Sequence, residues 1–352
     1  MKKTLSVLLA FAMLFAIVAC APAAQETAAT AAEAATEAPA AAEATAAAEK
    51  TIKIGFVNAG PDDYYNVSAE IISKAGAQRG WEVTVLNSEY TPEKEISNVE
   101  DLIAMGVDGI MIIAANMESA QTATQKANEA GIPIVFVAGG PAKGEGVPTT
   151  VVAGNWAFSG QWHANNLNEV FPDAKVILAE AVAGQDIGTL ITDNFESNFK
   201  GEVVGKQYCN WSRSETLAYV QDLIAKNQEM DVIFAYNEEQ AAGAKQALEE
   251  NGFKPGDVWI ISNNGKPLGL EMIQDGWMQY TVEFAPTTEA YVGVLAMEAV
   301  LAGKEVKPFI ENPAVCISAD NIGDAITWDP EQFLTSDYQK MDMDAIMASI
   351  LA

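Results

Sequence analysis

The chain has 352 residues, with 48 Asp and Glu against 20 Lys and Arg, and a formal net charge of −28. This excess of negative charge argues against a nucleic-acid partner and against electrostatic attraction to anionic lipids. With one histidine and three cysteines, the chain has little material for a zinc site or for a histidine-dependent catalytic triad, and we expect no metal.

The N-terminus predicts an exported lipoprotein. Two lysines precede an apolar run over residues 5–18, which is too short to span a bilayer comfortably. The run ends in IVAC, which resembles the bacterial lipobox. We therefore expect a lipoprotein signal peptide at 1–19, lipidation of Cys20, and anchoring to the outer face of the cytoplasmic membrane through the lipid alone. The alternative is a plain signal peptide with a chance cysteine.

Residues 20–50 predict a disordered tether. They are almost entirely Ala, Glu, Thr and Pro, and without large apolar side chains they cannot offset the entropy of ordering. Residues 51–352 are long enough for two lobes, each with its own core. Within them, Cys209 and Cys316 could form one disulfide or remain as two free thiols.

Apolar runs and segments of helical periodicity alternate along residues 51–302. The first series of strands is expected at 52–58, 82–87, 109–114, 133–138 and 149–154, with helices at 63–79, 92–105 and 117–130. The second series of strands is expected at 174–181, 202–208, 231–237, 257–262 and 278–284. Its helices are expected at 157–170, 187–200, 213–227, 238–251 and 266–275, and a last helix at 287–302. Near-continuous apolar strands joined by crossover helices predict an α/β fold with two doubly wound parallel-sheet lobes.

Ligands bind to open α/β sheets at the carboxyl ends of the strands, so the loops there are the expected site. These loops are rich in aromatic, amide and carboxylate side chains. Rings can cover the C–H faces of a polyhydroxylated ligand, while amides and carboxylates hydrogen-bond its hydroxyls. The candidate ligand-binding residues in or beside these loops are Asp62, Tyr64, Tyr65, Asn116, Trp156, Asp186, Trp211, Asn237, Asn264 and Glu283.

Several candidates have a purely structural alternative. The pair Tyr64 and Tyr65 could pack inward at a helix start, and we expect one of the two to do so. Asp63 is expected to be the N-cap of that helix, which leaves Asp62 for the ligand. For Asn237 the alternative is an N-cap of the following helix.

Three stretches resemble a known family in their order and spacing: TPEKEISNVEDLIAMGVDGIMI (91–112), NEAGIPIVFV (128–137) and IFAYNEEQAAGAKQALEENG (233–252). Over residues 51–312 the chain resembles the type I periplasmic sugar-binding proteins of ABC importers, the ribose-binding group in particular. The resemblance implies a periplasmic-binding-protein-like I fold.

We expect the two lobes to be joined by a hinge of three crossings. The expected crossings lie near 153–156, 283–286 and 310–315. The expected first lobe is then 51–154 plus 285–312, and 155–284 plus 313–352 form the second lobe and a tail.

The resemblance also implies roles for individual residues. Tyr64 and Tyr65 would cover one face of a sugar and Trp211 the other, Asn237 matches the family's ligand-binding asparagine, and Asn264 stands where ribose binders have an aspartate. The sequence departs from the family at positions where ribose binders carry arginine. In this chain the first of these positions holds Gly139, which follows Ala138, and the second falls at about Thr189. Ribose itself is therefore not expected, and a cationic or amino-sugar ligand becomes conceivable.

The function implied is capture of a small sugar or polyol by lobe closure, with delivery to the transmembrane subunits of an ABC permease, by a monomer in the periplasm or on the membrane surface. The alternatives are a ligand sensor for a signalling receptor and, less favoured, a carbohydrate-active enzyme with a carboxylate pair such as Asp62 and Asp186. No GxGxxG motif follows the first strand, so a dinucleotide is not expected, nor is any other cofactor. We expect a binding protein, not an enzyme.

Overall fold

The computed structural model describes residues 50–312 and 314–352. The predicted signal peptide, Cys20 and all but the last residue of the tether lie outside the described residues. Chain contacts group residues Lys50–Ala352 into one compact unit. No helix among the described residues combines the length and the apolar character needed to cross a bilayer.

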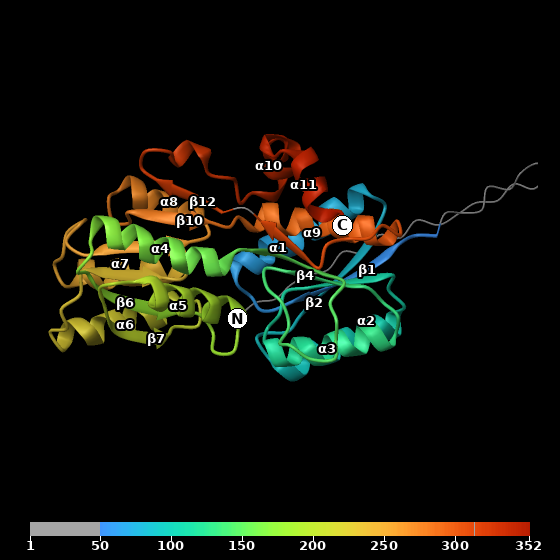
Figure 1. The fold of residues 1–352 in the computed structure, drawn as a ribbon, viewed down its shortest axis with the longest axis horizontal. Helices are drawn as coiled ribbons and strands as arrows, with labels where there is room; N and C mark the ends of the chain where they lie inside the picture. Colours follow the sequence, from blue (N-terminus) through green and yellow to red (C-terminus); the bar gives the residue numbers. More distant parts are fainter. Residues whose placement is uncertain (1–49, 313) are drawn as a thin grey trace, which may run out of the picture. The chain divides into compact units, whose positions relative to one another are not determined.

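The first sheet has six parallel strands in the order β11-β5-β4-β3-β1-β2. Their bounds are β1 Lys53–Asn58, β2 Glu82–Asn87, β3 Gly109–Ile112, β4 Ile134–Val137, β5 Thr150–Gly154 and β11 Phe309–Asn312. The helices of this lobe are α1 Asp63–Gln78, α2 Pro92–Met105, α3 Met117–Glu129 and α9 Pro286–Leu301. In Figure 1, α1 and α9 lie on one side of the sheet while α2 and α3 lie on the other, and each pair packs side by side.

The second sheet has the order β12-β10-β9-β8-β6-β7. Its strands are β6 Lys175–Glu180, β7 Glu202–Tyr208, β8 Val232–Ala235, β9 Trp259–Asn263, β10 Tyr280–Glu283 and β12 Val315–Ser318. Its helices are α4 Trp156–Val170, α5 Asp186–Asn198, α6 Arg213–Ala225, α7 Glu238–Glu250 and α8 Pro267–Gln274. Helix α4 packs on α5, and α6 packs on α7.

The predicted architecture of two doubly wound α/β lobes is confirmed, and every helix and strand predicted between residues 52 and 302 is present. The central strands β3, β4 and β8 are wholly buried apolar segments, as covering of both sheet faces requires. Several helices end where predicted because the chain turns there into the left-handed region at a glycine. Gly106, for example, has φ +68° and follows α2 directly.

The second sheet is not wholly parallel, which corrects the sequence prediction. Strand β12 pairs with β10 in antiparallel register. The reason lies in the third crossing, where only residues 313 and 314 separate β11 from β12. A strand that leaves the carboxyl end of one sheet and enters the facing sheet without a reversing helix must run against its new neighbours.

The sequence prediction places the tail after β12 with the second lobe, but most of its helices pack on the first. These helices are the 3₁₀ helix Ile322–Asp324, α10 Pro330–Thr335, the 3₁₀ helix Asp337–Lys340 and α11 Met343–Ile350. The first of them contacts β12 and so stays with the second lobe. Helix α10 contacts α1, and α11 contacts α9 and β11. Phe333 and Ile350 are fully buried, and the Phe333 ring lies 5.7 Å from the ring of Tyr291 on α9. Burial of these apolar side chains fixes the tail there.

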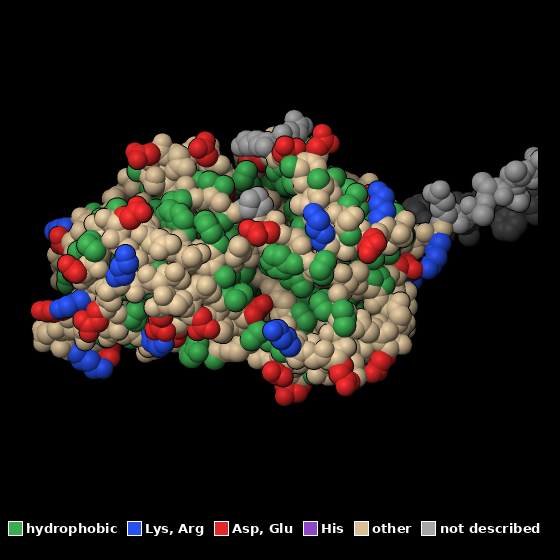
Figure 2. Space-filling view, viewed as in Figure 1, with side chains coloured by type: hydrophobic (Ala, Val, Ile, Leu, Met, Phe, Trp, Pro, Cys, Tyr) green, Lys and Arg blue, Asp and Glu red, His purple; other side chains and the backbone are tan. Residues whose placement is uncertain are grey.

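Two further features of the described residues are the surface charges and the cysteines. Figure 2 shows basic side chains scattered among acidic ones on the visible face, without a basic patch there. Cys209 and Cys316 are free thiols, of which Cys209 is buried. The open choice between a disulfide and two thiols is thereby resolved in favour of thiols.

Candidate ligand-binding site

A cavity lies where the carboxyl ends of the two sheets face each other. It has about 310 Å³ of empty space, part of it open to solvent. It is lined by Asp62, Tyr64, Tyr65, Trp156, Ile187, Trp211, Asn237 and Asn264. These residues follow β1, β5, β6, β7, β8 and β9, so both lobes contribute. Clefts between lobes that are lined by apolar rings with a few polar groups are common small-molecule sites.

Asp62 both starts α1 and lines the cavity. It is the N-cap of the helix, and its Oδ1 accepts a hydrogen bond from the Tyr64 backbone N–H at 2.8 Å. The prediction that Asp63 is the cap is therefore wrong, because Asp63 is already the first helical residue. Burial raises the pKa of Asp62, and the bond from Tyr64 offsets only part of that effect.

Aromatic rings form most of the cavity wall. The rings of Tyr64 and Tyr65 pack edge to face, with centroids 5.9 Å apart, and both residues are buried in the core as well as lining the cavity. Trp156 donates through Nε1 to the Ala138 carbonyl at 3.1 Å. Since this polar end is held by protein, Trp156 offers the cavity apolar ring surface.

Trp211 closes the cavity from the second lobe. It is half-buried, and its Nε1 donates to Gln185 Oε1 at 2.8 Å, while Gln185 Nε2 lies 3.5 Å from the Tyr65 hydroxyl across the cleft. Its backbone has φ +58°, a left-handed conformation that is unfavourable for a bulky residue. Backbone strain of this kind concentrates at functional sites, where surrounding contacts hold it.

Two asparagines complete the lining. Asn237 is indeed the N-cap of α7, with Oδ1 accepting from Gln240 N at 2.8 Å in a capping box. Its Nδ2 has only a long contact of 3.4 Å to the Trp211 carbonyl and remains available as a donor to a ligand. Asn264 follows β9 and also has a positive φ, of +98°.

A family model of the periplasmic binding protein domain matches residues 54–305, more than two thirds of the chain. The chain belongs to this family. The ribose import binding protein of Bacillus subtilis (strain 168) is 28% identical over 244 residues, which cover 69% of this chain and 79% of that protein. The fructose import binding protein of Bifidobacterium longum (strain NCC 2705) is 29% identical over 288 residues, covering 78% and 86%.

The fold of this periplasmic binding protein also matches solved structures. A solute-binding protein of an ABC transporter from Bacillus halodurans C-125, with bound myo-inositol, superposes with a TM-score of 0.73 at 21% identity. The match covers 78% of this chain and 96% of the other. At this identity the likeness supports the fold, and the predicted family resemblance is confirmed by the domain match.

Three predicted site residues do not line the cavity of this periplasmic binding protein. Asn116 caps α3 through Oδ1, which accepts from Glu118 N at 2.9 Å. Asp186 accepts from Gly140 N at 2.9 Å and so joins α5 to a loop of the first lobe. Glu283 accepts from Ile326 N at 2.7 Å. Each carboxylate or amide satisfies a backbone N–H outside the cavity instead.

Sequence reasoning missed three residues that build or support the site. Ile187 lines the cavity, but an apolar residue at a helix start gives no polar signal. Gln185 bridges Trp211 and Tyr65. Glu289, which is fully buried on α9, accepts hydrogen bonds from the Tyr64 hydroxyl and from Gly154 N. It therefore positions Tyr64 and ties it to the first inter-lobe crossing.

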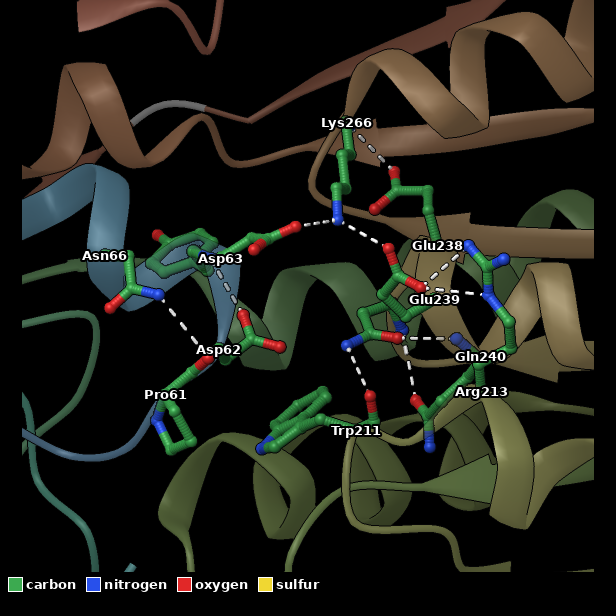
Figure 3. A network of polar contacts seen from close by, with 12 residues as sticks. Pro61, Asp62, Asp63, Asn66, Trp211, Arg213, Glu238, Glu239, Gln240 and Lys266 are labelled. Atoms are coloured by element: carbon green, nitrogen blue, oxygen red, sulfur yellow. Dashed lines mark hydrogen bonds and ion pairs between the residues drawn. The ribbon is translucent and has the colours of Figure 1, made fainter. Parts of the chain in front are cut away.

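A charged network joins the lobes beside the cavity (Figure 3). Lys266 Nζ, on the β9–α8 loop, lies 2.6 Å from Asp63 Oδ2 on α1 and 2.6 Å from Glu239 Oε1 on α7. Arg213 Nη2, on α6, lies 2.9 Å from Glu239 Oε2. Of these four charged residues, Asp63 alone comes from the first lobe. Separation of the lobes would therefore have to break the Asp63–Lys266 ion pair.

The arrangement offers hydrogen-bond donors and acceptors together with ring surfaces, which suits binding. Among residues 50–312 and 314–352, no group of three or more His, Cys, Asp or Glu side chains is arranged to hold a metal ion. Among the described residues that line the cavity, Asp62 is the only carboxylate.

Proposed function

We propose that the protein is an extracytoplasmic solute-binding protein that captures a small sugar or polyol between its lobes and delivers it to the transmembrane subunits of an ABC permease. The observation that carries this is the cavity itself, with rings and amides supplied by both sheets at their carboxyl ends. Membership of the periplasmic binding protein family supports it, as do relatives named for ribose and fructose import.

Binding is proposed to occur with closure of the lobes. The cavity wall comes from both lobes, so a ligand held by Tyr65 and Trp211 together contacts a complete site only in the closed arrangement. A ligand that binds the closed arrangement more tightly than the open one shifts the open–closed equilibrium toward closure. The three connections between the sheets are the proposed hinge, and the protein is proposed to act as a monomer.

A thermal-shift screen tests the proposed function. Pentoses, hexoses, polyols, amino sugars and nucleosides are offered singly to the purified protein. A ligand at about one hundred times its dissociation constant should stabilise the fold by about 2.7 kcal/mol, a shift that such a screen resolves. If no sugar or polyol raises the melting temperature while a ligand of another class does, the proposal fails.

The Asp63–Lys266 ion pair gives a prediction about closure. Asp63→Asn should weaken ligand binding about two- to fivefold, because it removes the first-lobe partner of Lys266 and so destabilises the closed state. The effect is modest since the Asp63 side chain is 65% exposed. It should shrink further at high salt, which screens exposed ion pairs. Calorimetric titration at low and high salt measures both.

Glu70→Gln is the matched control for that variant. Glu70 pairs with Lys74 one turn away on the same helix, so its loss removes an ion pair within the first lobe only. Equal weakening by both substitutions would contradict a role for Asp63 in closure.

Two other functions are less well supported. A glycoside hydrolase needs a pair of carboxylates across the scissile bond, whereas the lining residues in the described chain supply Asp62 alone. We therefore propose that the protein is not an enzyme. A ligand sensor would use the same cavity. Sugar uptake by cells that lack this protein distinguishes transport, which requires it, from sensing, which leaves uptake intact.

The lipid anchor at Cys20 remains a proposal from the sequence. Cys20→Ala should leave the protein unprocessed or release it from the membrane fraction, because the lipid is the proposed attachment. Fractionation of cells into membrane and soluble parts measures this, with Cys209→Ala as a control that retains the lipobox. Membrane association of a processed Cys20→Ala protein would show that another anchor exists.

A further inference from the structure

The charges that line the cavity are unbalanced. Asp62 is ionisable with a low reference pKa, and no Lys, Arg or His is among the described residues that line the cavity. The Oδ1 atom of Asp62 is bound by the Tyr64 backbone, whereas no donor within the described residues reaches its Oδ2. Figure 3 shows Asp62 and Trp211 as neighbours here, one from each lobe. A half-paired carboxylate thus lies at the ligand's position.

The nearby cations are already neutralised. Lys266, whose charge acts on Asp62, lies between Asp63 and Glu239, and Arg213 is paired with Glu239. Burial raises the pKa of Asp62, with Asp63 and Glu239 acting in the same direction and Lys266 against them. A positive charge supplied by the ligand would relieve this unfavourable environment of the carboxylate.

The rings around Asp62 also favour a cation. Tyr64, Tyr65, Trp156 and Trp211 all line the same cavity. The hydroxyl of Tyr64 and the indole N–H groups of both tryptophans are hydrogen-bonded to protein groups. Aromatic faces attract an ammonium group within about 6 Å, and most strongly where water is excluded. Several rings with one carboxylate form a site of the kind that recognises organic cations.

We propose that the ligand is a polyhydroxylated amine, such as an amino sugar or an amino-substituted cyclitol, whose ammonium group pairs with Asp62. This inference rests on the proposed function, because the amides and rings still bind the hydroxyls and C–H faces of a sugar-like body. The inference also excludes acidic sugars as ligands. A ligand carboxylate would be buried beside Asp62 with no compensating cation among the described lining residues.

Matched triads of ligands test the charge preference. Each triad has one ring in three forms: D-glucose with D-glucosamine and D-glucuronate, and D-galactose with D-galactosamine and D-galacturonate. myo-Inositol and an amino-deoxy-inositol form a further matched pair, one neutral and one an amine. Titrations at about pH 6.5, where the amines are largely protonated, should show the amine binding about tenfold or more tightly than its neutral parent in the best triad. The acid should not bind.

The outcomes separate this inference from the proposed function. If a neutral parent binds as tightly as its amine or more tightly, the inference is overturned while the proposed function stands. If neither neutral nor amine forms bind but a ligand outside the sugar and polyol class does, both are overturned.

Asp62→Asn provides a second readout on the same residue. Asparagine caps helices as well as aspartate does, so the substitution should leave the start of α1 intact. The ratio of amine to neutral-parent affinity should fall from about ten toward one, because the negative charge alone is removed. A ratio that stays unchanged in the variant would place the ammonium group elsewhere and overturn the pairing with Asp62.

Discussion

Trp211→Ala is expected to weaken ligand binding by about 1–3 kcal/mol, which corresponds to the loss of a stacking ring. Trp211 is the only aromatic lining residue contributed by the loops that follow the second sheet's strands β6, β7, β8 and β9 within the described chain. Without it, one side of a sugar held against Tyr64 and Tyr65 is left to solvent. Titration calorimetry of the parent and the variant measures the change.

The same variant should lose little stability without ligand. Trp211 is half-buried on a loop and holds a strained backbone at φ +58°, so its removal costs little core packing. Tyr208→Ala is the control, because Tyr208 is a largely exposed ring at the end of β7 that does not line the cavity. Undiminished affinity in Trp211→Ala, or an equal loss in Tyr208→Ala, would contradict a ring that contacts the ligand.

The free energy of unfolding is expected to fall as the pH rises from about 4.5 to about 7. Burial raises the pKa of Glu289 to about 7 from an ordinary value of 4.5, and Glu95 and Glu238 are raised to about 7 for the same reason. Over this range the folded state retains protons that the unfolded state has released. Since the folded state binds more protons, stability falls with pH through this window and levels off above about 7.

Glu289→Gln isolates one of these carboxyls. Glutamine retains hydrogen-bonding capacity toward Tyr64 and Gly154 but cannot ionise, so the loss of stability between pH 5 and 8 should shrink by on the order of 1–3 kcal/mol. Denaturant unfolding at a series of pH values measures it. Glu298→Gln, at a half-exposed position on the same helix, is the control and should leave the slope unchanged. A parental pH profile in Glu289→Gln would contradict a raised pKa at this site.

Most of the fold is readable from the sequence because its signals are local. Apolar runs mark the buried strands, and glycines such as Gly106 mark helix ends. The segments that were missed are short and depend on distant contacts. Strand β11 has only alternate residues buried, and it becomes a strand by pairing with β5. Helices α10 and α11 span six and eight residues and are fixed by packing on α1 and α9.

For the site as well, local signals are predictable from the sequence and distant contacts are not. Seven of its eight lining residues were predicted, because polar and aromatic side chains directly after parallel strands gather at one sheet edge. Asn116 and Asp186 carry the same signal, yet their side chains bind nearby backbone N–H groups. Sequence alone does not distinguish a cap from a ligand contact. Glu289 lies 225 residues from Tyr64, and only the folded structure brings the two together.

Small-angle X-ray scattering with and without ligand tests the central claim, capture by lobe closure, most directly. The ligand is a sugar, polyol or amino derivative that calorimetry has shown to bind. In its presence the radius of gyration should decrease, because the two lobes close over Asp62 and Trp211. Identical scattering profiles for the free and fully saturated protein would contradict the account.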